Sequence, residues 1–159
     1  MAIPAQAAPP QYLPATAEWC LEAPAAAAAS TPPSAPASPR RCIQLEVPST
    51  PRQYAWGLMG RPPLAPLTGM WFRFQPAEPV KFWMHRTPSP LDMVFLRDGR
   101  VIAIEAAAAP CPRLPCRSYG PAEASDGVVE LAAGQAAALG IRVGTPAVIR
   151  SLQPQAATP

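Results

Sequence analysis

The sequence predicts a mostly β fold of the α+β class: a small, mainly antiparallel sheet, curled or closed into a barrel, with short peripheral helices. Three observations predict it. Short segments alternate between apolar and polar residues with a period of two, which is the pattern of half-buried strands. The dipeptide Asp98-Gly99 stands between two apolar runs and is a strong hairpin signal. The candidate strands outnumber the candidate helices and are joined by hairpins rather than βαβ crossovers.

The first forty residues contain two segments that do not favour a folded core. Residues 1–16 are rich in Ala and Pro, and we expect a disordered tail there. Residues 23–40 consist almost entirely of Ala, Pro, Ser and Thr. Such a segment cannot bury enough apolar surface to offset the entropy lost on ordering, so it is predicted to be a low-complexity linker or a loop insertion.

A possible first strand lies between these two segments. Residues 17–22, with the sequence AEWCLE, form an apolar island with strand character, and residues 41–47 alternate with a period of two. We expect the two to form an antiparallel pair whose hairpin loop is lengthened by residues 23–40. The insertion is tolerable because each doubling of a surface loop costs only about 0.6 kcal/mol. In the alternative reading, residues 1–40 are all tail.

One globular domain is predicted over residues 42–151, followed by a tail at 152–159. The tripeptide Ser-Thr-Pro at residues 49–51 suits the start of a helix, because Ser and Thr cap helices and Pro is favoured in the first turn. We expect a short helix through residues 53–58 that stops at Gly60. A proline-rich extended loop follows it.

The rest of the domain is expected to be strands, with one further short helix. Residues 132–139 suit one or two helical turns that end at Gly140. Residues 109–121 are a loop rich in Pro and Cys. The expected strands cover residues 69–74, 80–84, 91–96, 101–105, 128–131 and 146–150.

Charge and hydropathy argue against two classes of partner. The net charge is +3, and Arg40-Arg41 is the only basic pair, so no basic stripe indicates nucleic-acid binding. No stretch approaches the roughly 20 apolar residues of a membrane span. The start of the chain lacks the basic region and the apolar core of a signal peptide.

Five sequence blocks resemble the domain-of-unknown-function family 192, in that family's order and at its spacing, over about residues 42–151. The blocks are GLMGR, GMWF, FWM, T-x-x-PLDM-x-F and VVELAAG…GI-x-VG. The resemblance implies a small β-rich fold with short helices and an extracytoplasmic location, since many members carry signal or lipoprotein segments. It implies no activity. The chain has His85-Arg86 where the family usually has Lys-Asn, and Gly144-Thr145 where the family often has Gly-Asp.

The four cysteines are candidates for two disulfides. Cys111 and Cys116 are predicted to close a proline-rich loop, and the alternatives are a free thiol pair or a redox or metal role. No metal site is predicted, because one such pair and a single histidine fall short of four zinc ligands. Cys20 and Cys42 lie on the two proposed N-terminal strands and can bridge if the register is right. Two bridges would fit an oxidising compartment; the alternative location is the cytoplasm.

Five side chains are candidates for ligand binding. Asp92 lies inside an apolar run, either at the floor of a ligand cleft or as a structural acceptor of backbone N–H groups. Trp71, Trp83 and Tyr119 would form an aromatic platform if exposed, and core packing is the alternative. His85 is the only histidine and a candidate general base.

The leading functional hypothesis is a non-catalytic module, outside the cytoplasm, that binds a ligand or a protein partner. The rival is a small enzyme that uses Asp92 with His85 or with the Cys111/Cys116 pair. Glu105 and Glu130 are the possible partners of Asp92 in acid–base work, although their spacing does not favour it. A third hypothesis is an accessory protein tethered to a larger assembly. No cofactor is predicted.

Overall fold

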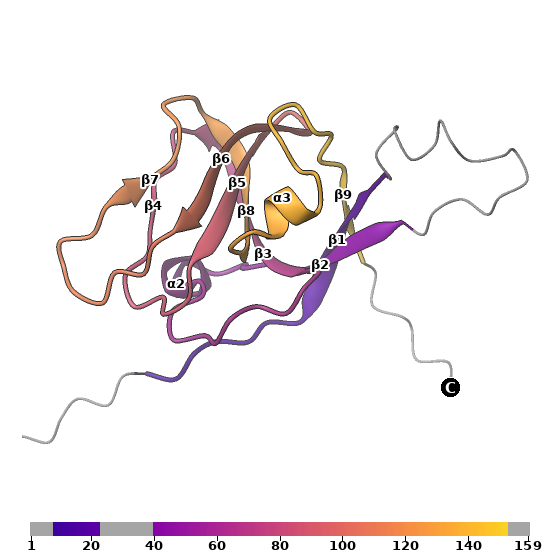
Figure 1. The fold of residues 1–159 in the computed structure, drawn as a ribbon. Coiled ribbons are helices and arrows are strands. Elements are labelled where there is room, and N and C mark those ends of the chain that lie inside the picture. Colours follow the sequence, from indigo (N-terminus) through magenta and orange to yellow (C-terminus); the bar gives the residue numbers. More distant parts are fainter. Residues whose placement is uncertain (1–7, 23–39, 153–159) are drawn as a thin grey trace, which may run out of the picture.

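A computed structural model of the protein describes residues 8–22 and 40–152. The predicted tail residues 1–7 and 153–159, and residues 23–39 of the predicted linker, lie outside the described residues. Figure 1 shows one large sheet, with the short helix α3 (Gln135–Ala138) against it and the strands β4 and β7 set apart from it.

Seven strands form one mixed sheet in the order β6-β5-β8-β3-β2-β1-β9. All neighbouring pairs are antiparallel except β2 and β3, which are parallel. A second sheet contains only β4 and β7. The strands of the large sheet are β1 (Ala15–Leu21), β2 (Arg41–Glu46), β3 (Thr68–Glu78), β5 (Leu91–Arg97), β6 (Arg100–Ala108), β8 (Ser125–Ala132) and β9 (Ile149–Ser151). The small sheet consists of β4 (Phe82–Trp83) and β7 (Ser118–Tyr119).

The sheet is open, so the predicted curled sheet or barrel is wrong. Its two edges, β6 and β9, do not pair with each other. One isolated bridge, between Arg100 and Pro146, joins the start of β6 to the segment before β9. The chain between β2 and β3 carries the helix α2 (Pro51–Trp56) and the proline-rich loop. A connection of that length lets β3 return parallel to β2, which a tight hairpin cannot do.

β1 and β2 form the antiparallel pair that the alternation predicts. Their register places Cys20 opposite Cys42. Trp19 and Ile43 are also opposite each other, and both are completely buried. β9 pairs with the other edge of β1.

Residues 8–14, which the sequence assigns to a tail, lie against the domain. The side chain of Gln11 donates to the backbone oxygens of Gln53 and Gly57, at 2.9 Å each. Arg61 forms an ion pair of 2.9 Å with Glu46 and also donates to the carbonyl of Gln11. Proline prevents this segment from forming regular structure, but side-chain hydrogen bonds hold it in place.

The sheet buries both of its faces, because alternate residues of its central strands enter two different clusters. The first cluster contains Trp19, Val94 and Val129 and is covered by Ala136 and Leu139 of the α3 region. The second contains Met70, Phe72, Met84, Met93, Phe95 and Val128, with Tyr54 of α2 packed against it. Strands that are buried on both faces have nearly continuous runs of apolar residues in their sequences.

The helices α2 and α3 are short and begin or end at the predicted signals. Thr50 caps α2: its side chain accepts from the backbone N–H of Gln53, and the Gln53 side chain accepts from the backbone N–H of Thr50, a capping box. After α3 the chain turns at Gly140, whose φ is 71°.

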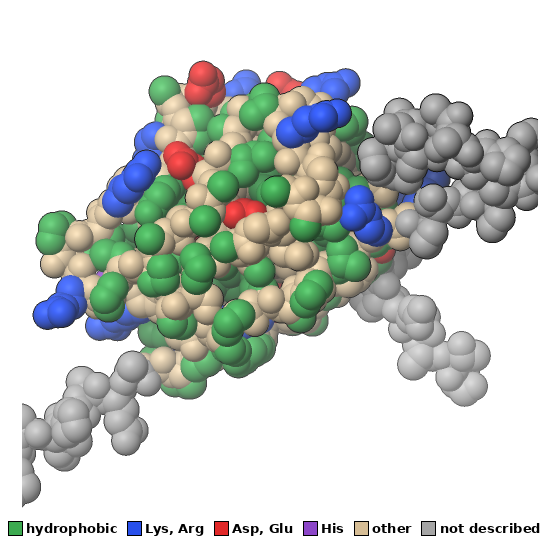
Figure 2. All heavy atoms as spheres, in the orientation of Figure 1, with side chains coloured by type: hydrophobic (Ala, Val, Ile, Leu, Met, Phe, Trp, Pro, Cys, Tyr) green, Lys and Arg blue, Asp and Glu red, His purple; other side chains and the backbone are tan. Residues whose placement is uncertain are grey.

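Among the described residues, no helix is long and apolar enough to cross a membrane. Figure 2 shows Lys and Arg side chains spread around the rim of one face rather than gathered into a single stripe.

Candidate functional site

Asp92 serves as an internal acceptor. Its side chain is 1% exposed, and its two carboxylate oxygens accept the backbone N–H groups of Ala107 and Ala136 at 2.9 and 3.0 Å. The carboxylate therefore ties the end of β6 to the first turn of α3. Asp92 lines neither of the two hollows described below.

Tyr119 packs in the second cluster and is 8% exposed. Its hydroxyl accepts from the backbone N–H of Ala109 at 3.3 Å, and the guanidinium of Arg117 lies 4.8 Å from its ring centroid. It also lines neither hollow. Its position is that of a core residue with a satisfied hydroxyl.

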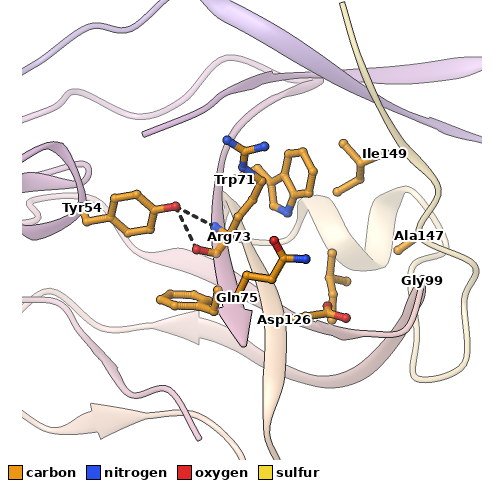
Figure 3. A pocket seen from close by; sticks show the side chains of 10 residues that line it. Tyr54, Trp71, Arg73, Gln75, Gly99, Asp126, Ala147 and Ile149 are labelled. Carbon is orange, nitrogen blue, oxygen red and sulfur yellow. Dashed lines mark hydrogen bonds between the residues drawn. The ribbon is translucent and has the colours of Figure 1, made fainter. Parts of the chain in front are cut away.

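The larger hollow is a groove of about 650 Å³ beside residues 71–75 of β3. Figure 3 shows Trp71, Arg73 and Gln75 following one another along this strand, with Asp126 of β8 nearby and Ile149 and Ala147 on the other side. Tyr54 holds the strand, because its hydroxyl donates to the carbonyl of Arg73 at 2.8 Å and accepts from the N–H of the same residue at 3.2 Å. Phe74, Leu96 and Gly99 complete the lining.

The groove offers more donors than acceptors. The guanidinium of Arg73 lies 5.5 Å from the ring centroid of Trp71, and it has no ion pair or side-chain hydrogen bond among the described residues. The indole N–H of Trp71 is buried and also has no partner in that part of the chain. The one carboxylate of the lining, Asp126, accepts from the backbone N–H of Asp98 at 2.8 Å. Of the five predicted ligand-binding candidates, Trp71 is the one that lines this groove.

The second hollow is a small cavity of about 50 Å³ between α2, β3, the β4 segment and β8. It contains two other candidates, Trp83, which is 46% exposed, and His85. It also contains Glu130, which is 4% exposed. The remaining lining residues are Tyr54, Ala55, Trp56, Gly57, Met59, Phe72, Phe82 and Thr87.

Glu130 is the strongly perturbed acid of the described structure. Burial raises the pKa of its carboxyl from 4.5 to about 8, because the charged form is desolvated. The carboxyl is therefore protonated at neutral pH. From the sequence, Glu130 is predicted only as a possible partner of Asp92 in acid–base work. The signal that could have found it is one acidic residue inside the apolar run of β8, whose neighbours Val129 and Leu131 are buried.

Both predicted disulfides are present, and no described cysteine is free. Cys20–Cys42 joins β1 to β2, and Cys111–Cys116 closes the proline-rich loop. Glu18 lies within 4.8 Å of the first pair of sulfur atoms. Those sulfur atoms are bonded to each other and are not thiolates, so the arrangement offers a metal only one carboxylate.

The chain is similar to one protein family and to solved structures. The sequence model of domain-of-unknown-function family 192 (DUF192), described as "Uncharacterized ACR", matches residues 34–149. A solved structure from Sinorhizobium meliloti 1021, described as a "putative transcription regulator", is similar over 89% of this chain and 97% of its own, with 27% identity and a TM-score of 0.68. A protein of unknown function from Novosphingobium aromaticivorans DSM 12444 is similar over 94% and 98%, with 28% identity and a TM-score of 0.67. No curated protein matches significantly.

Proposed function

The chain belongs to domain-of-unknown-function family 192, and on that premise we propose that it is a non-catalytic module that binds a small ligand carrying a carboxylate next to an apolar group. The site is the groove along β3. The observation that carries the proposal is the guanidinium of Arg73, which has no ion pair among the described residues and lies over the ring of Trp71 on the wall of a groove of about 650 Å³.

The chemistry of the groove favours an anionic group. A guanidinium presents donors in a planar fork that matches a carboxylate, and such charge-assisted pairs are the strong ones. Gln75 can add a further donor. The apolar wall formed by Leu96, Ala147 and Ile149 would contact the body of the ligand. A volume of this size is in the range of small-molecule sites.

Binding is favoured over catalysis by the distribution of reactive groups. Both oxygens of Asp92 are engaged by backbone N–H groups, and His85 lines the other hollow. Within the groove, the described lining residues include neither a histidine nor a cysteine. The rival enzyme that pairs Asp92 with His85 therefore has no support from the geometry.

We also propose an extracytoplasmic location. The support is the pair of disulfides, because such bonds persist in oxidising compartments and are rare in the cytosol. The name of the S. meliloti neighbour refers to transcription, but a net charge of +3 without a basic stripe does not favour nucleic acid as the ligand here.

The test uses phenylacetate and its neutral counterpart 2-phenylethanol as probes, followed by the indole N–H resonances in NMR titrations. Phenylacetate is expected to shift the Trp71 resonance saturably and to bind more tightly than the alcohol. Arg73→Gln should weaken phenylacetate binding about tenfold or more, as expected for loss of a charge-assisted pair. Arg52→Gln, which changes an exposed arginine of α2 outside the groove lining, is the matched control. Equal binding of the two probes, or an Arg73→Gln variant that binds normally, would contradict the proposal.

A further inference from the structure

Glu130 is a buried carboxyl that has no compensating partner in the part of the chain that the structure describes. Its Cα lies opposite those of Met70 and Met93 on the two neighbouring strands, and both methionines are completely buried. Among the described residues, no hydrogen bond or ion pair reaches its carboxyl, and no Lys or Arg lines its cavity. Buried acids are normally hydrogen-bonded or paired, because desolvation of an unpaired carboxylate is costly. An acid left in this state is a candidate for binding a ligand.

Aromatic side chains form the walls around this carboxyl. Tyr54, Trp56, Phe72, Phe82 and Trp83 all line the cavity. The rings of Phe72 and Phe82 are 4.9 Å apart, edge to face, and those of Tyr54 and Phe72 are 5.8 Å apart in the same arrangement. The faces of aromatic rings are negative and attract cations, most strongly when water is excluded.

We propose that this cavity binds an organic ammonium group, which places its positive charge against Glu130 and between the aromatic walls. The carboxylate supplies the counter-charge, and the rings supply cation–π attraction and exclude water. A metal ion suits the cavity less well, because among its described lining residues Glu130 and His85 are the only strong metal-ligating side chains, and hard cations need about six oxygen ligands. Trp83 is 46% exposed, so we place the entrance of the proposed site at this wall.

The proposed site is separate from the groove. Only Tyr54 lines both hollows. The groove presents the cation Arg73 and the cavity presents the acid Glu130, so the two sites favour opposite charges. Failure of phenylacetate to bind leaves the ammonium site intact, and the reverse also holds.

Proton competition gives the site a characteristic pH dependence. The titratable groups that face Glu130 are Tyr54 from α2 and His85 from the segment after β4, whereas β3 and β5 present Met70, Phe72 and Met93. Burial raises the pKa of Glu130 to about 8, so an ammonium group must displace a proton at neutral pH. Between pH 6.5 and 8.5 the ionised fraction of such an acid rises severalfold or more, and the affinity should rise with it.

The experiment compares ethanolamine with ethylene glycol, in which a hydroxyl replaces the ammonium group. Both are titrated into the full chain at pH 6.5 and 8.5 while the indole N–H resonances of Trp56 and Trp83 are followed. The indole N–H of Trp19 donates to the carbonyl of Pro146, away from the cavity, and serves as the internal reference. Ethanolamine is expected to shift the two cavity resonances saturably, with binding that is severalfold or more tighter at pH 8.5 than at pH 6.5. Ethylene glycol should leave them unchanged.

Two variants separate the proposed contacts from folding. Glu130→Gln keeps the shape and resembles the protonated acid, so it should fold and lose ethanolamine binding at both pH values. Trp83→Leu removes one exposed aromatic wall and should weaken binding severalfold without abolishing it. The control is Glu105→Gln, a carboxylate on β6 outside the cavity lining. Equal binding of both probes, binding retained in Glu130→Gln, or the absence of any saturable shift would overturn the proposal.

Discussion

The Nδ1 atom of His85 lies 3.8 Å from the sulfur of Cys116. The same segment is joined to the other end of this disulfide loop, because the N–H of Cys111 donates to the carbonyl of Met84 at 3.1 Å and the N–H of Arg86 donates to the carbonyl of Cys111 at 3.3 Å. The rings of Trp83 and His85 are 5.1 Å apart. The disulfide loop therefore supports the wall of the small cavity.

Protein isolated from its native cell should contain no free thiols before reduction and four after it, since the chain has four cysteines and both pairs are bonded. The measurement is a thiol count in denatured protein with and without prior reduction. Four free thiols throughout would argue against the bonds and against the extracytoplasmic location.

The two disulfides should differ in their contribution to stability. The loop-entropy relation assigns about 3 kcal/mol to Cys20–Cys42, with its sequence separation of 22, and about 2 kcal/mol to Cys111–Cys116, with its separation of 5. Urea unfolding of the Cys20→Ala/Cys42→Ala and Cys111→Ala/Cys116→Ala variants measures the difference. Only the second variant should shift the indole resonance of Trp83. The reverse pattern of resonance shifts would refute the link between loop and cavity.

Asp92→Asn should lower the free energy of unfolding by about 1–3 kcal/mol. The amide NH₂ cannot accept one of the two backbone N–H groups that the carboxylate satisfies, and a buried donor is left without a partner. Chemical denaturation gives the magnitude. Phenylacetate and ethanolamine titrations of the folded variant should be unchanged, and loss of either would assign Asp92 a direct binding role.

Glu130 should make the protein less stable as the pH rises from about 5 to 8. Its folded-state pKa is about 8 and its ordinary value is 4.5, so between these values the unfolded chain loses a proton that the folded chain keeps bound. The contribution of Glu130 therefore lowers the free energy of unfolding as the pH rises, by at most about 1.4 kcal/mol per pH unit. The decrease levels off above the folded-state pKa. Glu130→Gln removes this pH-dependent contribution to the free energy of unfolding.

The Glu130→Gln variant should accordingly have the same stability as the parent protein near pH 5 and a higher stability than the parent at pH 8. Melting temperatures of the two proteins, measured across this range in a buffer free of amines, give the comparison. Parallel pH profiles would show that Glu130 titrates normally in the folded state.

Local patterns in the sequence were sufficient for the elements whose signals are short-range. The apolar island of residues 17–22 and the period of two in residues 41–47 predict β1 and β2 as an antiparallel pair. The register that places Cys20 opposite Cys42 comes from the structure. The hairpin at Asp98-Gly99 and the cap at Thr50 follow in the same way, because turn and cap chemistry involves residues only a few positions apart.

The tertiary structure alone decided the order of the strands and which residues line the two hollows. β8 inserts between β5 and β3, and no local signal specifies that neighbour, because a strand with two apolar faces can pair with several others. This insertion places Glu130 opposite Met70 and Met93 under an aromatic wall from α2 and β4. The sequence by itself determined which residues are apolar and which residues can form a turn, cap a helix or form a disulfide. Long-range pairing determined that backbone N–H groups satisfy Asp92, whereas no group of the described residues forms a hydrogen bond with the carboxyl of Glu130.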